Sequence, residues 1–337
     1  MKTTLLRFLG LAIVSAGLYS GSAQAENLAI CYNCPPQWAD WAGQVKNIKS
    51  DTGITVPLDN KNSGQSLAQI ITEKKSPVAD VVYLGITSAI EAMKYDVLGT
   101  YKPKHWDEIP ADLKDPDGHW VAIHSGTIGL FVNKAALEGK PVPQSWADLL
   151  KPEYKGMVGY LDPSSAFVGY AGAVAINQAS GGSLADFTPV INYFKKLKQN
   201  QPIVPKQTSY ARVLSGEIPI LIDYDFNAYR AKYKDKADVV FVIPKEGTVS
   251  VPYVMSMVKG APHPENAHKV LDYVLSDKGQ AHWANAFLKP VRNVKIPKDI
   301  ADKFLPASDY ARAKTVNYAQ VAKEQDAFQR LYLDQVH

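Results

Sequence analysis

Short apolar runs alternate with longer amphipathic stretches through the first third of the chain. The apolar runs lie at residues 28–31, 54–57 and 78–84, and the amphipathic stretches begin near residues 37, 64 and 87. Short apolar runs predict strands, and apolar positions repeating with a period near 3.6 predict helices. The resulting βαβαβ order predicts parallel strands connected by right-handed crossovers.

A second unit with the same pattern begins after residue 133. Its predicted strands and helices lie at residues 157–161, 167–178, 184–197, 218–222 and 239–243. Two extended stretches, residues 120–132 and 248–258, precede and follow this unit. We interpret them as strands that cross between two lobes, near residues 125–128 and 248–254. Ligands of such sheets bind beyond the carboxyl ends of the strands, which places the expected site between the lobes.

The first 25 residues are organised like a secretory signal peptide. Lys2 and Arg7 flank the start of an apolar run, residues 8–14, and Ala23-Gln24-Ala25 forms a small-residue cleavage site. A lipoprotein is the alternative, because residues 28–31 resemble a lipidation box, although Ile30 is bulky for that position. We expect cleavage after Ala25 and a soluble mature protein in the periplasm, since no later apolar run is long enough to span a bilayer.

The remaining chain is too long for one ordinary core and suits two lobes. The pattern predicts an α/β fold in which residues 26–125 build the first part of lobe 1 and residues 126–247 build lobe 2. Residues 248–337 are expected to return to lobe 1 and to add C-terminal helices.

Charge and cysteine content argue against several classes of function. Removal of Lys2 and Arg7 lowers the formal net charge from +4 to +2, which is too small to favour nucleic acid or an anionic membrane as a partner.

Cys31 and Cys34 can form a local disulfide in an oxidising compartment. A redox pair is the alternative, but such a pair normally lies at a helix N-terminus, and two prolines follow here. Two cysteines are too few for a structural zinc site, so we expect no metal and no cofactor.

Two segments near the C-terminal end of the predicted sheet are specific in composition and spacing. Residues 258–267 have the sequence VKGAPHPENA, and residues 271–280 have the sequence LDYVLSDKGQ. Pro262 and Pro264 would end a strand and preset a helical turn, and Gly279 would permit a sharp helix end. Together the segments resemble a signature of bacterial extracellular solute-binding proteins, in the subgroup that includes ferric-ion, phosphonate, sugar-phosphate and polyamine binders. Residues 144–149 (QSWADL) and 152–156 (PEYKG) resemble another segment of this family.

The resemblance extends from about residue 27 to residue 297. It implies a type II periplasmic binding protein fold, in which two mixed sheets flanked by helices are joined by hinge strands. It also implies a monomer that captures a small polar solute and delivers it to the permease of an ABC transporter in the inner membrane. It does not identify the solute.

Loops that follow strands and open helices supply the candidate ligand contacts, because free backbone N–H groups and the helix dipole favour anions there. The candidates are Asn33, Ser63, Gly64, Gln65, Gly85 and Thr87 in the first lobe, and Ser125, Thr127, Ser164 and Ser165 at the crossing and in the second lobe. For each serine or threonine, the alternative is that it simply caps a helix. Their convergence at the expected site predicts a ligand with a phosphate or phosphonate group.

The end of the predicted strand at residues 218–222 carries three further candidate ligand contacts, Asp223, Tyr224 and Asp225. In ferric-binding relatives the equivalent segment has adjacent tyrosines, so the single Tyr224 argues against iron. The two carboxylates suit a ligand ammonium, which would make the solute a zwitterion. Alternatively, Asp225 only caps the next helix. A polyamine or ferric-ion ligand is the alternative within the same transport class.

An enzyme is the main rival class of function. The sequence contains no Gly-x-Ser-x-Gly, His-Glu-x-x-His or P-loop motif, and Cys34 is its one notable nucleophile. An adhesin or scaffold is a third class, for which the sequence offers no repeats. We therefore predict a binding protein and not an enzyme.

Overall fold

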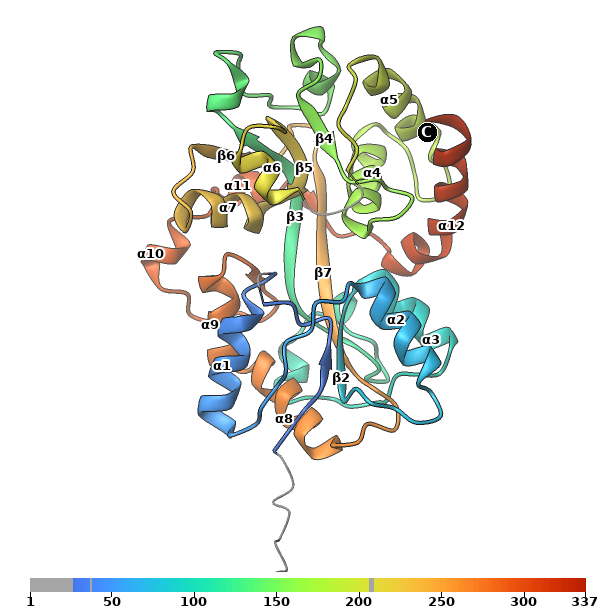
Figure 1. The fold of residues 1–337 in the computed structure, drawn as a ribbon, viewed down its shortest axis with the longest axis vertical. Helices are drawn as coiled ribbons and strands as arrows, with labels where there is room; N and C mark the ends of the chain where they lie inside the picture. Colours follow the sequence, from blue (N-terminus) through green and yellow to red (C-terminus); the bar gives the residue numbers. More distant parts are fainter. Residues whose placement is uncertain (1–26, 37, 206–208) are drawn as a thin grey trace, which may run out of the picture.

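Two long antiparallel strands, β3 (Val121–Asn133) and β7 (Thr248–Met257), run through the middle of the computed structural model (Figure 1). The structure describes residues 27–36, 38–205 and 209–337, so the predicted signal peptide lies outside the described residues. β3 pairs with β7 as far as Thr127, opposite Ser250. From Ile128 onward it pairs with β5 (Ile220–Tyr224) instead. β3 therefore takes part in two sheets, one in each lobe.

The lower lobe in Figure 1 is a mixed sheet flanked by helices. β1 pairs parallel to β2, whereas β2 pairs antiparallel to β7, and β8 pairs antiparallel to β3. The strands are β1 (Cys31–Tyr32), β2 (Val81–Gly85) and β8 (Lys289–Pro290), and the helices are α1 (Trp41–Thr52), α2 (Ser63–Thr72), α3 (Ile86–Lys94), α8 (Pro264–Leu275) and α9 (Asp277–Asn285). Two 3-10 turns, Trp106–Glu108 and Ala111–Leu113, precede β3.

The upper lobe is also built on a mixed sheet. β4 pairs parallel to β5, and both β5 and β6 pair antiparallel to β3. The elements are β4 (Val158–Tyr160), α4 (Phe167–Ala179), α5 (Thr188–Gln199), α6 (Tyr210–Leu214), α7 (Asp225–Tyr233) and β6 (Val239–Val242). Three 3-10 turns, Ala135–Leu137, Ala147–Leu150 and Pro152–Tyr154, connect β3 to β4.

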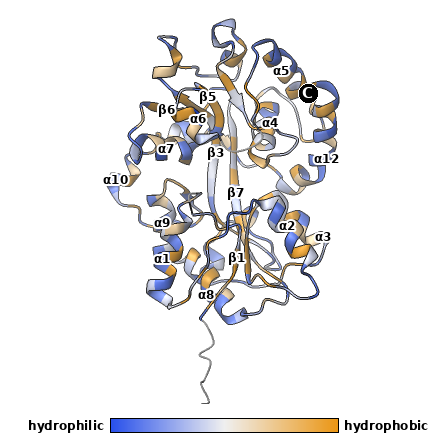
Figure 2. Cartoon of the chain, viewed as in Figure 1, coloured by the Kyte–Doolittle hydropathy of each residue, from blue (hydrophilic) through white to orange (hydrophobic). Residues whose placement is uncertain are grey.

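The core lies on both faces of these sheets. Every residue of β2 and of β5 is buried, as expected for strands covered by helices on both sides. Figure 2 shows hydrophobic colouring on strands inside each lobe and paler colouring on β3 between the lobes, whereas the outer side of α12 is mainly hydrophilic. In α8 the buried residues include Ala267, Val270 and Leu271, the apolar face predicted from the sequence.

The C-terminal segment connects the two lobes a further time. It contains α10 (Lys298–Ala301), α11 (Ala307–Tyr310), β9 (Ala313–Lys314) and α12 (Tyr318–Gln335). α12 packs against α3 of the lower lobe and α5 of the upper lobe. In the upper lobe, Tyr170 Oη donates to the carbonyl of Val321 at 2.8 Å. Among the described residues, no helix has the length and apolar character needed to cross a membrane.

Most predicted elements form, with two local exceptions. The predicted strand at residues 54–57 is reduced to one bridge between Leu28 and Thr55. Gly279 does not end a helix as predicted, because α8 already ends at Leu275 and Gly279 lies in the first turn of α9. A Cβ on Gly279 would lie 2.2 Å from the carbonyl oxygen of Tyr273, so glycine is required by close contact between the two helices.

Candidate functional site

Asn33, Ser63 and Gly85 meet where the strands of the lower lobe end. Asn33 Nδ2 donates to the carbonyl of Tyr83 at 2.6 Å and to Ser63 Oγ at 3.3 Å. The backbone N–H of Gly85 donates to the same hydroxyl at 3.0 Å. Asn33 has a left-handed backbone (φ 64°), and the Cys31–Cys34 disulfide encloses it. Ser63 therefore holds two loops of the lower lobe together and is not the cap of α2.

Neighbouring candidates in the lower lobe have other roles. Asn62 caps α2, and the side chain of Gln65 completes a capping box by accepting from the N–H of Asn62. Gly64 is exposed in the first turn of α2, and Thr87 is buried in the first turn of α3. The N-cap of α3 is Gly85, which has no side chain to cap the helix. The first N–H groups of α3 are thus left without a side-chain cap.

The serines of the upper lobe precede α4 without capping it. The N–H and the hydroxyl of Ser164 both donate to Asp162 Oδ1, at 2.8 and 2.6 Å. Ser165 is exposed, and the N-cap of α4 is Ala166, which makes no side-chain hydrogen bond. α4 therefore resembles α3 in having an N-terminus with no side-chain cap.

Aromatic side chains from both lobes meet at the lobe boundary. We call Trp38, Phe167, Tyr224, Phe226 and Tyr253 the aromatic cluster. The Trp38 ring lies 5.1 Å from the ring of Phe226 and 5.9 Å from that of Tyr253, between ring centroids. Trp38 Nε1 donates to Tyr83 Oη at 3.2 Å. These contacts join the lower lobe directly to the end of β5.

The N-termini of α3 and α4 approach each other at this boundary. A Cβ on Gly85 would lie 2.9 Å from Cδ1 of Phe167, the first residue of α4. Gly85 therefore permits the close contact between lower and upper lobe. Two uncapped helix N-termini, one from each lobe, lie on either side of that contact.

Asp223 and Asp225 at the end of β5 are buried and hydrogen-bonded within the protein. Asp223 accepts from the N–H of Tyr224 at 2.8 Å and from Asn227 Nδ2 at 2.9 Å. Asp225 Oδ1 accepts from the N–H groups of Thr127 and Phe226, both at 2.9 Å. Asp225 is the first residue of α7, not its N-cap, and its contact with β3 goes beyond simple helix capping.

Comparison with known proteins identifies the family. The family model described as "Bacterial extracellular solute-binding protein" matches residues 76–324, most of the chain. The chain belongs to this family. The assignment suggested by the sequence signature is thereby confirmed.

This solute-binding protein is 31% identical over 279 residues to an uncharacterized protein of Haemophilus influenzae, covering 80% of this chain and 79% of the relative. It is 26% identical over 255 residues to a periplasmic protein of Salmonella typhimurium that is named for binding 2-aminoethylphosphonate, covering 74% and 73% of the two chains. The solved structure of AfuA from Actinobacillus pleuropneumoniae, with fructose-6-phosphate bound, superposes with a TM-score of 0.77 at 22% identity, covering 91% of this chain and 98% of AfuA. The two-lobed periplasmic binding protein fold is thus confirmed, and the protein serves as the solute-binding component of an ABC transporter.

Burial dominates the electrostatics of the solute-binding protein at the end of β5. It raises the pKa of Asp223 to about 6 and that of Asp225 to about 6, and hydrogen bonds from backbone and side chains oppose the shift. Burial also raises the pKa of Tyr224 well above its usual range. Lys289 lies near Asp225, and burial lowers the pKa of its ammonium to about 8. Tyr224 Oη and Thr127 Oγ1 are buried without a hydrogen-bond partner among the described residues.

Sequence reasoning singled out Tyr224 but missed the other members of the aromatic cluster and the partners of Asp225. Phe226 follows Asp225 directly and Phe167 follows the predicted serine loop, so an aromatic residue beside each candidate segment was the available sign. Ser125 was predicted as a ligand contact, and the structure places it on β3, half-buried and opposite Lys289 of β8. Lys289 and Tyr310 could not be linked to the site by any local pattern.

Two cavities of the upper lobe lie away from the candidate residues. One, of about 350 Å³, is lined by residues of α5 and by Trp146 and Glu246. The other, of about 500 Å³, runs along β6 and is lined by Arg312 and Leu305 among others. Neither is lined by a residue predicted to contact the ligand.

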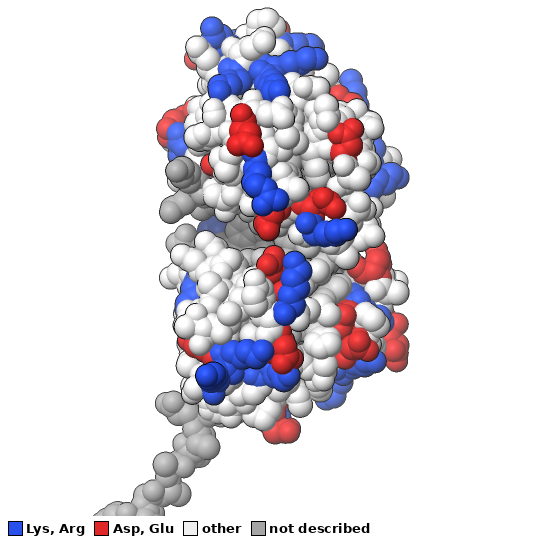
Figure 3. Space-filling model, turned by 90° about the vertical axis from the view of Figure 1, so that its right-hand side faces the viewer, with Lys and Arg blue, Asp and Glu red and all other residues white. Residues whose placement is uncertain are grey.

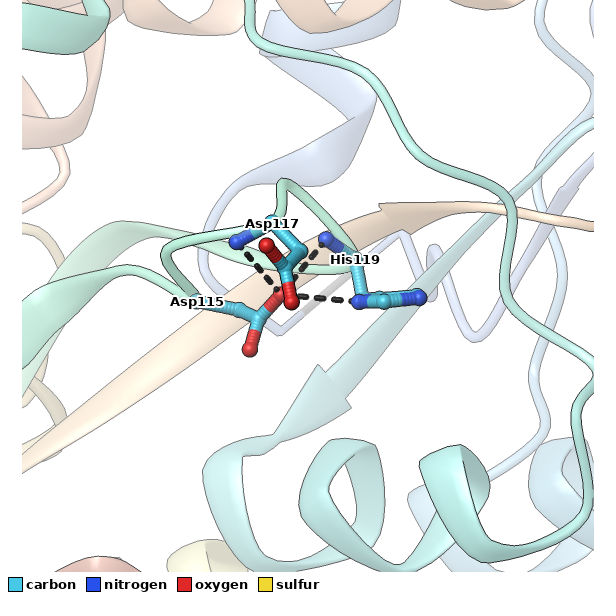
Figure 4. A group of neighbouring side chains, drawn as sticks. All are labelled: Asp115, Asp117 and His119. Atoms are coloured by element: carbon cyan, nitrogen blue, oxygen red, sulfur yellow. Dashed lines mark hydrogen bonds and ion pairs between the residues drawn. The ribbon is translucent and has the colours of Figure 1, made fainter.

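Asp115, Asp117 and His119 form a turn before β3, where their ligand-type atoms lie within 4.8 Å of one another (Figure 4). Asp115 Oδ2 accepts from the N–H groups of Asp117 and His119, at 3.2 and 3.1 Å, and lies 2.8 Å from His119 Nδ1. These hydrogen bonds explain the cluster as a turn held by one carboxylate.

On the face of the molecule in Figure 3, basic and acidic side chains are intermixed over both lobes.

Proposed function

We propose that this solute-binding protein captures a small solute bearing a phosphate or phosphonate group at the lobe boundary, in the periplasm, after removal of residues 1–25. The observation that supports this most directly is the pair of uncapped helix N-termini, α3 and α4, which face the boundary from opposite lobes. Free N–H groups and the helix dipole at such ends favour anions. An anion bound by both would favour the closed arrangement of the lobes, because it gains contacts there that neither lobe offers alone.

The names of the relatives support the same class of ligand. The Salmonella relative is named for 2-aminoethylphosphonate and AfuA was solved with fructose-6-phosphate, so both ligands carry a phosphorus oxyanion. For a ligand with an ammonium group, Asp223 is the better-placed carboxylate, because it accepts only two hydrogen bonds within the protein. The bound solute would then pass to the ABC permease.

We expect phosphonates and sugar phosphates, but not putrescine, to stabilise the purified protein. Binding at 100 times the dissociation constant adds about 2.7 kcal/mol to the free energy of unfolding, which raises the melting temperature by about 5 °C or more. The measurement is thermal unfolding with 2-aminoethylphosphonate, ethylphosphonate, fructose-6-phosphate and putrescine. Small-angle scattering with the best ligand should show a smaller radius of gyration, since the lobes close about β3 and β7. Stabilisation by putrescine alone would contradict the proposal.

We expect ferric ion to give no tyrosinate charge-transfer band. Tyr224 has no adjacent tyrosine, and its burial keeps the hydroxyl protonated, whereas hard ferric ion prefers several anionic oxygen ligands. The measurement is visible absorption during titration with ferric citrate, with Tyr224→Phe as the control. A band present in wild type and lost in the variant would show that iron is bound here.

A further inference from the structure

Asp225 lies where β3 changes its partner strand. Thr127 is the last residue of β3 opposite β7, and Ile128 is the first opposite β5, where it faces Tyr224. The N–H of Thr127 donates to Asp225 Oδ1 at 2.9 Å. This carboxylate therefore fixes the backbone of β3 at the point where the strand passes from one lobe to the other.

Asp225 also holds the C-terminal segment. Its second oxygen, Oδ2, accepts from Tyr310 Oη of α11 at 2.9 Å. Tyr310 Oη in turn lies 2.8 Å from Tyr229 Oη of α7, which accepts from the N–H of Leu305 at 3.0 Å. The ammonium of Lys289 lies over the Tyr310 ring, 3.0 Å from its centroid. Lys289 belongs to β8, which pairs with β3 in the lower lobe.

Elements of both lobes thus converge on one carboxylate, and little of it is available to a solute. Asp225 is 1% exposed, and its two oxygens already accept three hydrogen bonds. A buried carboxylate with three donors is well satisfied, and removing the one donor to Oδ2 leaves that oxygen without its hydrogen bond.

We propose that Asp225 is a positioning residue, which sets the relative placement of the lobes through Thr127 and Tyr310 and does not contact the solute. The proposal rests on the proposed solute-binding function for its affinity measurements only. If Asp225 does not contact the solute, replacing it should weaken the binding of a solute with an ammonium group and of one without it by the same factor.

The test compares Asp225→Asn, Tyr310→Phe and the double variant with wild type. An asparagine cannot accept at both side-chain atoms, and Tyr310→Phe removes one of the three donors to Asp225 without altering the carboxylate itself. Tyr233→Phe is the matched control, because it removes a hydrogen bond of 3.0 Å between α7 and the carbonyl of Lys303 without touching Asp225. Folding of each variant is checked by circular dichroism.

The rate of backbone amide hydrogen exchange around residues 125–128, measured without ligand, tests the positioning role directly. Asp225→Asn and Tyr310→Phe should each speed exchange there about tenfold, the double variant should be no faster than Asp225→Asn, and Tyr233→Phe should match wild type. Because burial raises the pKa of Asp225 to about 6, protonation favours the closed segment over any opening that solvates the carboxylate. Exchange in wild type, corrected for its intrinsic pH dependence, should therefore slow below about pH 6, while Asp225→Asn loses this step. The titratable groups facing Asp225 are Lys289, Tyr310, Tyr229 and Asp223. Unchanged exchange in a folded Asp225→Asn would overturn the proposal.

Calorimetry with 2-aminoethylphosphonate and ethylphosphonate separates positioning from ligand contact. Positioning predicts that Asp225→Asn and Tyr310→Phe weaken both solutes by the same factor, about tenfold. Direct contact predicts that Asp225→Asn weakens only the solute with an ammonium group and that Tyr310→Phe binds as wild type does, which would overturn the proposal. If wild type binds neither solute, the proposed function fails, and the exchange experiment still tests the role of Asp225.

Discussion

His124→Phe should be less stable than wild type at pH 7 and more stable than wild type at pH 4. His124 lies on β3, is fully buried, and stacks on Tyr253 with ring centroids 5.5 Å apart. Burial lowers the pKa of its imidazole from 6.5 to about 3, so the folded protein keeps it neutral. The unfolded chain protonates it below pH 6.5, and this favours unfolding as the pH falls.

The size of the effect follows from the width of that window. A group whose pKa is depressed on folding contributes stability that is present above its unfolded pKa, here 6.5, and is lost as the pH falls towards the folded value of about 3. At about 1.4 kcal/mol per pH unit, wild type loses about 3 kcal/mol between pH 6.5 and pH 4 through this residue, and the variant loses none of it. At pH 7 the variant lacks one hydrogen bond, which costs about 1 kcal/mol.

Tyr83→Phe is the control for this prediction. It removes the same hydrogen bond, of 2.8 Å between Tyr83 Oη and His124 Nε2, together with the one from Trp38 Nε1, but keeps the imidazole. It should therefore be destabilised at pH 7 and retain the acid sensitivity of wild type. The measurement is the free energy of unfolding by urea from pH 4 to pH 7.5. A constant difference between His124→Phe and wild type across that range would show that His124 is not held neutral.

Gly169→Ala should destabilise the protein by about 3 kcal/mol and weaken solute binding. Gly169 lies in the first turn of α4, and a Cβ there would lie 2.1 Å from the carbonyl oxygen of Leu161. The obstacle is backbone, so either α4 or the loop carrying Ser164 and Ser165 must shift. Because that loop and the N-terminus of α4 belong to the proposed site, affinity and stability should fall together.

Gly172→Ala, one turn further along α4, is the matched control. A Cβ there would lie 3.1 Å from Ile222 Cγ2, a side-chain atom that can move by a few tenths of an ångström. The gain in helix propensity, up to about 1 kcal/mol, should offset this contact. Thermal unfolding and calorimetry on both variants provide the comparison. Equal effects of the two substitutions would refute the argument from close contact at Gly169.

The sequence was sufficient to predict the order of the elements and the two-lobed fold. Strands such as β2 and β5 are buried on both faces, so they appear as uninterrupted apolar runs, and α8 has a regular apolar face. The strand predicted at residues 54–57 failed because Pro57 cannot donate a ladder hydrogen bond and only Thr55 pairs. The sequence singled out Gly279 for a special role, but glycine is required there because α8 lies close to it, and not because of the backbone conformation of Gly279 itself.

The site was harder to predict, because its decisive contacts join residues far apart in the sequence. The end of β5 could be identified as a polar segment, but nothing local shows that Asp225 accepts from both Thr127 and Tyr310. Likewise, Trp38 meets Phe226 only because the two lobes are in contact. Periodicity describes one element at a time, whereas these contacts depend on the path of the chain between lobes.

That path also decides the order in which the protein can fold. β2 and β7 pair from Val81 with Met257 to Gly85 with Tyr253, so the whole upper-lobe sheet lies between the two strands in the chain. The upper-lobe strands pair over shorter separations, such as Val158 with Ile220 and Ile128 with Tyr224, than β2 and β7 do, and closing a shorter loop costs less entropy. The sheet of the lower lobe must wait until β7 is available, with residues 31–85 exposed meanwhile. Closure of the lower sheet is therefore a late step, which depends on an upper lobe that has already brought β3 and β7 together.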